Sequence, residues 1–175
     1  DIIISGANHQ TLIGGNDADH YVFEANWGQD TVTEEKNGGT GDWLDFEKIE
    51  NKLRFDFYSP IATTGQNGIQ VQELTPSDVA TNNKLNNVKY IEKITGGNND
   101  NLYKFHDDWG QFTSSNPTEK HSLIIHDTES SHDKGTLDFS DVKHDLLFEL
   151  DSEGKVKVTA VVTAENSITT FTYIV

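Results

Sequence analysis

The sequence contains no cysteine, and its basic residues are few. Without cysteine the chain can form neither a disulfide framework nor a cysteine-ligated zinc site. Lysine and arginine together number 13 against 29 aspartates and glutamates, which gives a formal net charge of −16. Binding to nucleic acid or to an anionic membrane surface needs a basic patch, so this balance argues against both. No apolar run approaches the roughly 18 residues of a membrane span, and the first residues do not show a basic n-region followed by an apolar h-region.

The chain is also short of residues for a core. Hydrophobic residues make up 34% of it, and with glycine added the share still falls slightly below that of typical globular domains. Such a self-repelling chain needs counter-charge, and multivalent cations are the obvious source. Bound metal is also one way to stabilise an extracellular domain that has no disulfides. The chain opens on Asp1 rather than methionine, so we expect it to be a segment of a longer protein.

An internal repeat organises the sequence. Residues 13–29 read IGGNDADHYVFEANWGQ, and residues 95–111 read TGGNNDNLYKFHDDWGQ, with eight identities at one offset, 96 − 14 = 82. The segment LDF at 44–46 recurs at 137–139 with an offset of 93, so the second copy carries 93 − 82 = 11 additional residues. Residues 88–91 resemble 171–174, as if a third copy began there. Repeats of this kind predict a stacked architecture, here with copies at 1–93 and 94–175 in one elongated domain.

Short apolar stretches alternate with turns rich in aspartate, asparagine and glycine, which favours strands over helices. Residues 53–57, 148–150 and 155–158 alternate with period two, as half-buried strands do. The segment 76–87 is the one place where we expect a short helix or a long loop. The predicted fold class is all-β.

A nine-residue period within the first copy carries a family resemblance. Its units are 5–13 (SGANHQTLI), 14–22 (GGNDADHYV) and 37–45 (NGGTGDWLD). The second unit resembles the RTX (hemolysin-type) calcium-binding nonapeptide G-G-x-G-x-D-x-U-x. Gly14, Gly15, Asp19 and Tyr21 match the motif, and Asp17 replaces its third glycine. The resemblance covers residues 5–46 and about 95–104.

The resemblance implies a parallel β-roll or β-solenoid with additional strands and calcium ions between successive turns. The residue types suit that chemistry, because calcium takes about six to eight oxygen ligands and glycine permits the positive φ of tight turns. By the motif, Asp19 and Asp42 are the leading ligand candidates. Further candidates lie in the same turns: Gly14, Gly15, Asn16, Asp17, Gly38, Gly39, Thr40 and, as a weaker carboxylate, Asp30.

The second copy departs from the motif. Asn101 stands where Asp19 would be, and Gly135 where Asp42 would be. Two interpretations remain open: this copy has lost calcium, or Asn99 and Asp100, with Asn101, form a weaker site. The 11-residue insertion holds Asp127, His132 and Asp133, which could rebuild a site or face water.

Aromatic and histidine residues are expected to play lesser roles. Trp27 and Trp109 occupy equivalent repeat positions and should pack in the core, whereas Trp43 is the tryptophan that we expect to be exposed and able to touch a ligand. His121, His126 and His132 lack the spacing of a metal motif and are read as a solvated loop.

The function that the resemblance implies is structural calcium binding in a secreted or cell-surface protein, exported by type I secretion and folding on extracellular calcium. Two alternatives stay open: an adhesin, S-layer or filament repeat that binds copies of itself or a surface, and a non-catalytic accessory domain of an extracellular lipase, protease or polysaccharide-modifying enzyme. The sequence has neither a G-x-S-x-G elbow nor a P-loop, and we expect no enzymatic activity. Calcium is the one cofactor expected, with no nucleic-acid partner and no membrane insertion.

Overall fold

The computed structural model describes residues 1–35, 41–59, 66–107, 109, 122–127, 135–152, 155–161 and 171–174. All regular elements in these residues are β-strands, so the predicted all-β class is confirmed. No helix in this described part is long and apolar enough to cross a membrane.

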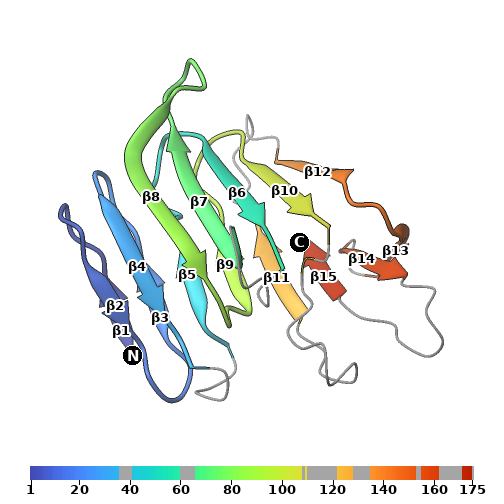
Figure 1. The fold of residues 1–175 in the computed structure, drawn as a ribbon, viewed down its shortest axis with the longest axis horizontal. Helices are drawn as coiled ribbons and strands as arrows, with labels where there is room; N and C mark the ends of the chain where they lie inside the picture. Colours follow the sequence, from blue (N-terminus) through green and yellow to red (C-terminus); the bar gives the residue numbers. More distant parts are fainter. Residues whose placement is uncertain are drawn as a thin grey trace.

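The strands form two sheets that lie one over the other (Figure 1). Across the first sheet the order is β1 (Ile2–Ile4), β3 (His20–Val22), β5 (Trp43–Asp45), β9 (Lys93–Thr95), β11 (Ser122–His126), β15 (Phe171–Ile174), β14 (Val156–Val161) and β13 (Asp145–Leu150). Across the second sheet it is β12 (Thr136–Asp141), β10 (Leu102–His106), β6 (Leu53–Phe57), β7 (Ile69–Leu74), β8 (Ala80–Val88), β4 (Gln29–Thr33) and β2 (Thr11–Ile13).

From β1 to β5 the chain passes alternately between the sheets, and neighbouring strands are parallel. Two antiparallel meanders break this pattern. One is β6–β7–β8 within the second sheet, and the other is β13–β14–β15 at the end of the first. Both sheets are therefore mixed, and the described residues do not form the closed parallel roll that the resemblance implies.

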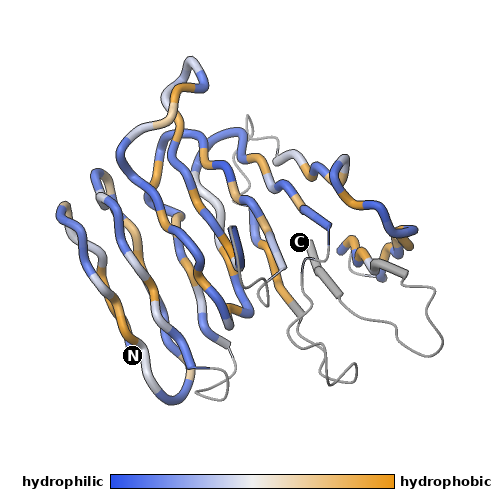
Figure 2. Tube along the Cα trace, viewed as in Figure 1, coloured by the Kyte–Doolittle hydropathy of each residue, from blue (hydrophilic) through white to orange (hydrophobic). Residues whose placement is uncertain are grey.

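Alternating side chains build the core between the sheets. In β7, Ile69 and Val71 are buried while Gln70 and Gln72 face outward, as the two-residue period of a strand requires. Figure 2 shows the same alternation of apolar and polar residues along many of the strands. Stacked aromatic rings fill much of the core, including Phe23 on Phe46 at 4.5 Å and Phe55 on Tyr103 at 4.9 Å between centroids. Each such buried ring contributes about 1.5–3 kcal/mol relative to an exposed one.

The sequence repeat is visible in the strand pairing. Tyr21 of β3 pairs with Leu44 of β5, and Tyr103 of β10 pairs with Leu137 of β12, so repeat-equivalent residues make the same parallel pairs. The first pair lies in the first sheet and the second in the other, because the chain crosses between the sheets an odd number of times from β3 to β10. The division into copies at residue 93 stays a prediction.

Two sequence expectations can be checked directly. Trp27 and Trp109 are buried, as predicted. The expectation of a helix or loop over 76–87 was wrong, because residues 80–88 form β8. This strand pairs with β7 on one side and β4 on the other. That pairing supplies its backbone hydrogen bonds, although its polar sequence does not indicate a strand.

Candidate metal centre

Two neighbouring turns meet at one edge of the molecule. The first turn connects β2 to β3, and the second connects β4 to β5. Ile13 pairs with Thr33 where the turns begin, and His20 pairs with Trp43 where they end. This register places Gly14 beside Glu34 at the start of the turns. It likewise places Asp19 beside Asp42 at their end, since neighbouring strands lie about 4.8 Å apart.

Three carboxylates converge between these turns. One oxygen from each of Asp19, Glu34 and Asp42 lies within 4.8 Å of the others. All three residues are buried, with exposed fractions of 1%, 8% and 1% respectively. The backbone N–H of Asp19 donates to Oδ1 of Asp42 at 2.8 Å, and the hydroxyl of Tyr21 donates to Oε1 of Glu34.

The cluster has fewer hydrogen-bond donors than its buried carboxylate oxygens need. Oδ2 of Asp19 and Oε2 of Glu34 are buried without a hydrogen-bond partner. The one ion pair to the cluster among the described residues comes from the amine of Asp1, whose nitrogen lies 2.8 Å from Oδ1 of Asp19. A buried ionised carboxylate without donors costs several kcal/mol, so this arrangement requires a positive charge or protons.

Other buried carboxylates in the described part of the chain have donors. Asp30 accepts from the Ser5 hydroxyl at 2.5 Å and from the Gln10 N–H at 2.8 Å. Glu73 accepts from three side chains, those of Trp27, Asn51 and Asn83. Among the buried carboxylates of this part of the chain, unpartnered oxygens therefore occur at Asp19 and Glu34, both in the cluster.

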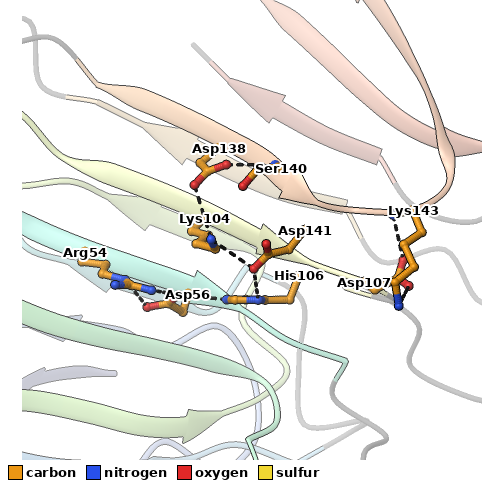
Figure 3. Close-up of polar contacts among 9 residues, drawn as sticks. All are labelled: Arg54, Asp56, Lys104, His106, Asp107, Asp138, Ser140, Asp141 and Lys143. Carbon is orange, nitrogen blue, oxygen red and sulfur yellow. Dashed lines mark hydrogen bonds and ion pairs between the residues drawn. The ribbon is translucent and has the colours of Figure 1, made fainter.

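A charged ladder on the outer face of β6, β10 and β12 makes the same contrast (Figure 3). Arg54 Nε donates to Asp56 at 2.7 Å, and His106 Nε2 lies 2.9 Å from the same carboxylate. The Lys104 ammonium lies 3.0 Å from Asp141. Each acid here lies beside a base, so the charges of the ladder are neutralised within it and no further ligand is needed.

Burial and mutual repulsion shift the pKa values of the groups in the cluster. Burial raises the pKa of the Glu34 carboxyl above its ordinary value; the Tyr21 hydrogen bond partly offsets this, and the Asp42 and Asp19 charges add to it. Burial also raises the pKa of Asp42, again with the Asp19 charge adding to the effect. The pKa of Tyr21 rises through burial and its contact with Glu34, so its hydroxyl stays protonated and donates. A cation among these carboxylates would offset both the cost of their burial and the repulsion that adds to these pKa shifts.

Gly14 lines the cluster with bare backbone. A Cβ added at this residue would meet Glu34 Oε1, Asp19 Oδ2 and the Tyr21 hydroxyl at closer than contact distance. The first motif glycine therefore provides space beside the carboxylates. Gly15 instead has a φ of +100°, and a Cβ there would meet nothing within 4 Å.

The structure brings together some of the predicted ligands and separates others. Asp19 and Asp42 lie in the cluster, lined by Gly14. Asn16 and Asp17 are exposed at the tip of the first turn, where Asp17 has a φ of 73°. Asp30 lies apart with its own donors. Gly38, Gly39 and Thr40 lie outside the described residues.

The second-copy candidates do not form a carboxylate cluster in the described residues. Asp100 is exposed, and its N–H donates to Oδ1 of Asn99 at 2.8 Å. The amide of Asn99 donates in turn to the Glu50 carbonyl at 3.2 Å.

Glu34 was not among the predicted ligands, because it lies outside the nonapeptide units. A signal for it did exist, since adding the second offset gives 34 + 93 = 127, which is Asp127. An acid therefore occupies this position in both copies. Trp43, expected to be exposed, is half-buried and stacks on His20 at 3.8 Å, with the Lys93 ammonium 3.5 Å from its ring.

A comparison of this chain with protein families, curated proteins and solved structures finds no significant match in any of the three.

Proposed function

We propose that this chain is a calcium-stabilised β-rich repeat module of a secreted or cell-surface protein, with Asp19, Glu34 and Asp42 as ligands of one ion. The observation that carries the proposal is the buried, donor-poor carboxylate cluster. The RTX-like nonapeptide that contributes Asp19 agrees with it, as does the parallel coiling of β1 to β5, which we take to be of the β-roll type.

The ligand chemistry selects the class of cation. The metal-ligand atoms that the cluster offers are carboxylate oxygens, which suit hard cations such as calcium rather than the imidazole- or thiolate-preferring transition metals. Calcium takes about six to eight oxygens, so three carboxylates supply part of a shell, and backbone carbonyls and water supply the rest. Because the ion binds the folded turns and not the open chain, its binding free energy becomes folding free energy.

This coupling gives the module its role. Without calcium, a formal charge of −16 and the repelling carboxylates weaken the fold. With calcium outside the cell, the first turns close and the module becomes rigid. No catalytic role enters the proposal, and the chain acts as a structural segment.

Calcium titration of the EDTA-stripped chain tests the proposal. Isothermal calorimetry should show saturable calcium binding, and the melting temperature by circular dichroism should rise with calcium. At calcium 100 times the dissociation constant the stabilisation is about 2.7 kcal/mol. Identical melting in EDTA and in several millimolar calcium would refute the proposal.

A matched pair of isosteric variants locates the site. Asp42→Asn removes a cluster charge but keeps an oxygen to accept the Asp19 N–H, and it should weaken calcium binding at least about tenfold, the equivalent of 1.4 kcal/mol. Asp30→Asn removes a buried charge that already has donors and should leave calcium affinity unchanged. Equal losses in the two variants would mean that calcium responds to net charge rather than to this cluster.

A further inference from the structure

The second copy contains an arrangement of residues like that of the metal centre. Gly96, Asn101, Tyr103 and Asp127 correspond to Gly14, Asp19, Tyr21 and Glu34, and we call these the second and the first cradle. The turns of the second cradle connect β9 to β10 and β11 to β12. Thr95 pairs with His126 before the turns, and Leu102 pairs with Thr136 after them. The register therefore places Gly96 beside Asp127 and Asn101 beside Gly135.

The atoms around the two leading glycines correspond one to one. A Cβ on Gly14 would meet a tyrosine hydroxyl, the carboxylate of Glu34 and Oδ2 of Asp19. A Cβ on Gly96 would meet a tyrosine hydroxyl, the carboxylate of Asp127 and Nδ2 of Asn101. An amide nitrogen in the second cradle thus stands where a carboxylate oxygen stands in the first.

That nitrogen satisfies the second cradle. Nδ2 of Asn101 donates to Oδ1 of Asp127 and to the Gly97 carbonyl, both at 2.9 Å. The Tyr103 hydroxyl donates to the same Asp127 oxygen at 2.8 Å. Oδ1 of Asn101 accepts from the Leu53 N–H at 3.2 Å, as Oδ1 of Asp19 faces the nitrogen of Asp1. Asn101 therefore has partners on both ends, whereas Oδ2 of Asp19 has none.

The charge count differs accordingly. The first cradle brings together Asp19, Glu34 and Asp42, whereas among the residues that the structure describes the second holds one carboxylate, that of Asp127. At Gly135, the equivalent of Asp42, an added Cβ would collide with Oδ2 of Asp127, so this position is filled by the acid at the start of the same β11–β12 turn. One anion with two donors needs no counter-ion.

We infer that the Asn101 amide takes the place of the cation in the second cradle, so that the chain binds one calcium ion and only its first copy depends on it. This rests on the proposed function for the first cradle. It decides between the two interpretations of the second copy: the site is closed by hydrogen bonds rather than weakened. The second copy then forms its turns without calcium, and calcium binding completes the first.

Exchanging the two residues tests the inference. Asp19→Asn gives the first cradle an amide that can donate to Glu34, so the variant should melt higher than wild type in EDTA and should bind no calcium. Asn101→Asp removes two buried donors and adds a charge beside Asp127. It should melt at least about 5 °C lower than wild type in EDTA and should recover in calcium, with the calorimetric stoichiometry rising from one to two.

The outcomes separate this inference from the proposed function. If wild type binds one calcium ion but neither exchange changes melting in EDTA, the amide closure is wrong and the calcium site stands. If wild type binds no calcium but the exchanges shift EDTA melting in the opposite directions expected, the closure stands and the calcium site is wrong. Two ions on wild type, or an Asp19→Asn variant that melts lower than wild type in EDTA, would overturn the inference.

Discussion

The Tyr21 hydroxyl donates to one oxygen of Glu34 and leaves the other oxygen buried without a partner. The bond joins the strand after the first turn to the start of the second turn. It therefore fixes Glu34 beside Asp19 rather than leaving its longer side chain free to reach water. A second-copy counterpart, Tyr103 with Asp127, makes the same bond at 2.8 Å.

Replacing Tyr21 or Tyr103 by phenylalanine should show which of the two cradles binds calcium. Tyr21→Phe removes the donor that positions Glu34, so we expect weaker calcium binding and a loss of about 1–3 kcal/mol in the unfolding free energy in calcium. Tyr103→Phe removes the equivalent bond and should cost a similar amount of stability with no change in calcium affinity. Urea unfolding and calorimetry measure the two effects. An equal fall in calcium affinity for both variants would contradict the assignment of the ion to the first cradle.

The two leading glycines of the nonapeptide allow a second comparison. Gly14 is required for the space beside the carboxylates, and Gly15 for its backbone conformation. Gly14→Ala places a methyl group against Glu34, Asp19 and the Tyr21 hydroxyl, so it should abolish measurable calcium binding. Gly15→Ala meets open space but sits at a φ of +100°, so it should cost about 1 kcal/mol of stability through backbone strain and keep calcium affinity. Calcium binding that survives in Gly14→Ala would place the ion elsewhere.

The fold was predictable where the sequence reports local chemistry. Alternation of apolar and polar residues and the Asp/Asn/Gly turns identify strands, and Tyr21 and Leu44 are buried as the motif requires. The strand β8 was missed because its residues have poor strand propensity. Tertiary pairing overrides that preference, helped by Gln72, whose side-chain amide donates to the carbonyls of Thr81 and Asn83 at 3.0 and 3.1 Å.

The candidate site was predictable in part for the same reason. Asp19 and Asp42 follow from the motif, because each immediately precedes a strand of the first sheet and those strands are neighbours. Glu34 depends on the pairing of β2 with β4 in the other sheet, which no single nonapeptide contains. The hydrogen bonds of Asn101 are also invisible to a motif, which records only that an aspartate is missing.

Two pairs of carboxyls should change the stability of the calcium-free chain in opposite directions as pH falls. Burial raises the pKa values of Glu34 and Asp42 in the folded state, so the folded chain binds protons at pH values where the unfolded carboxyls are still ionised. The stability contributed by these two groups therefore rises as pH falls through their raised folded pKa values toward the ordinary values of about 4. Asp107 and Asp138 work against this trend. Their pKa values are lowered in the folded chain, so the stability that these two groups contribute is lost as pH falls.

A difference between two chains isolates the cluster from those other groups. In EDTA, the double variant Glu34→Gln/Asp42→Asn should be more stable than wild type at pH 7.5, because it lacks the repelling charges. The gap should narrow toward pH 5 as protons neutralise the wild-type cluster. In calcium the order at pH 7.5 should reverse, since only wild type binds the ion, and falling pH should weaken that binding through proton competition. Urea unfolding at several pH values measures each gap, and one that is independent of pH in EDTA would show that these carboxyls do not titrate with raised pKa values.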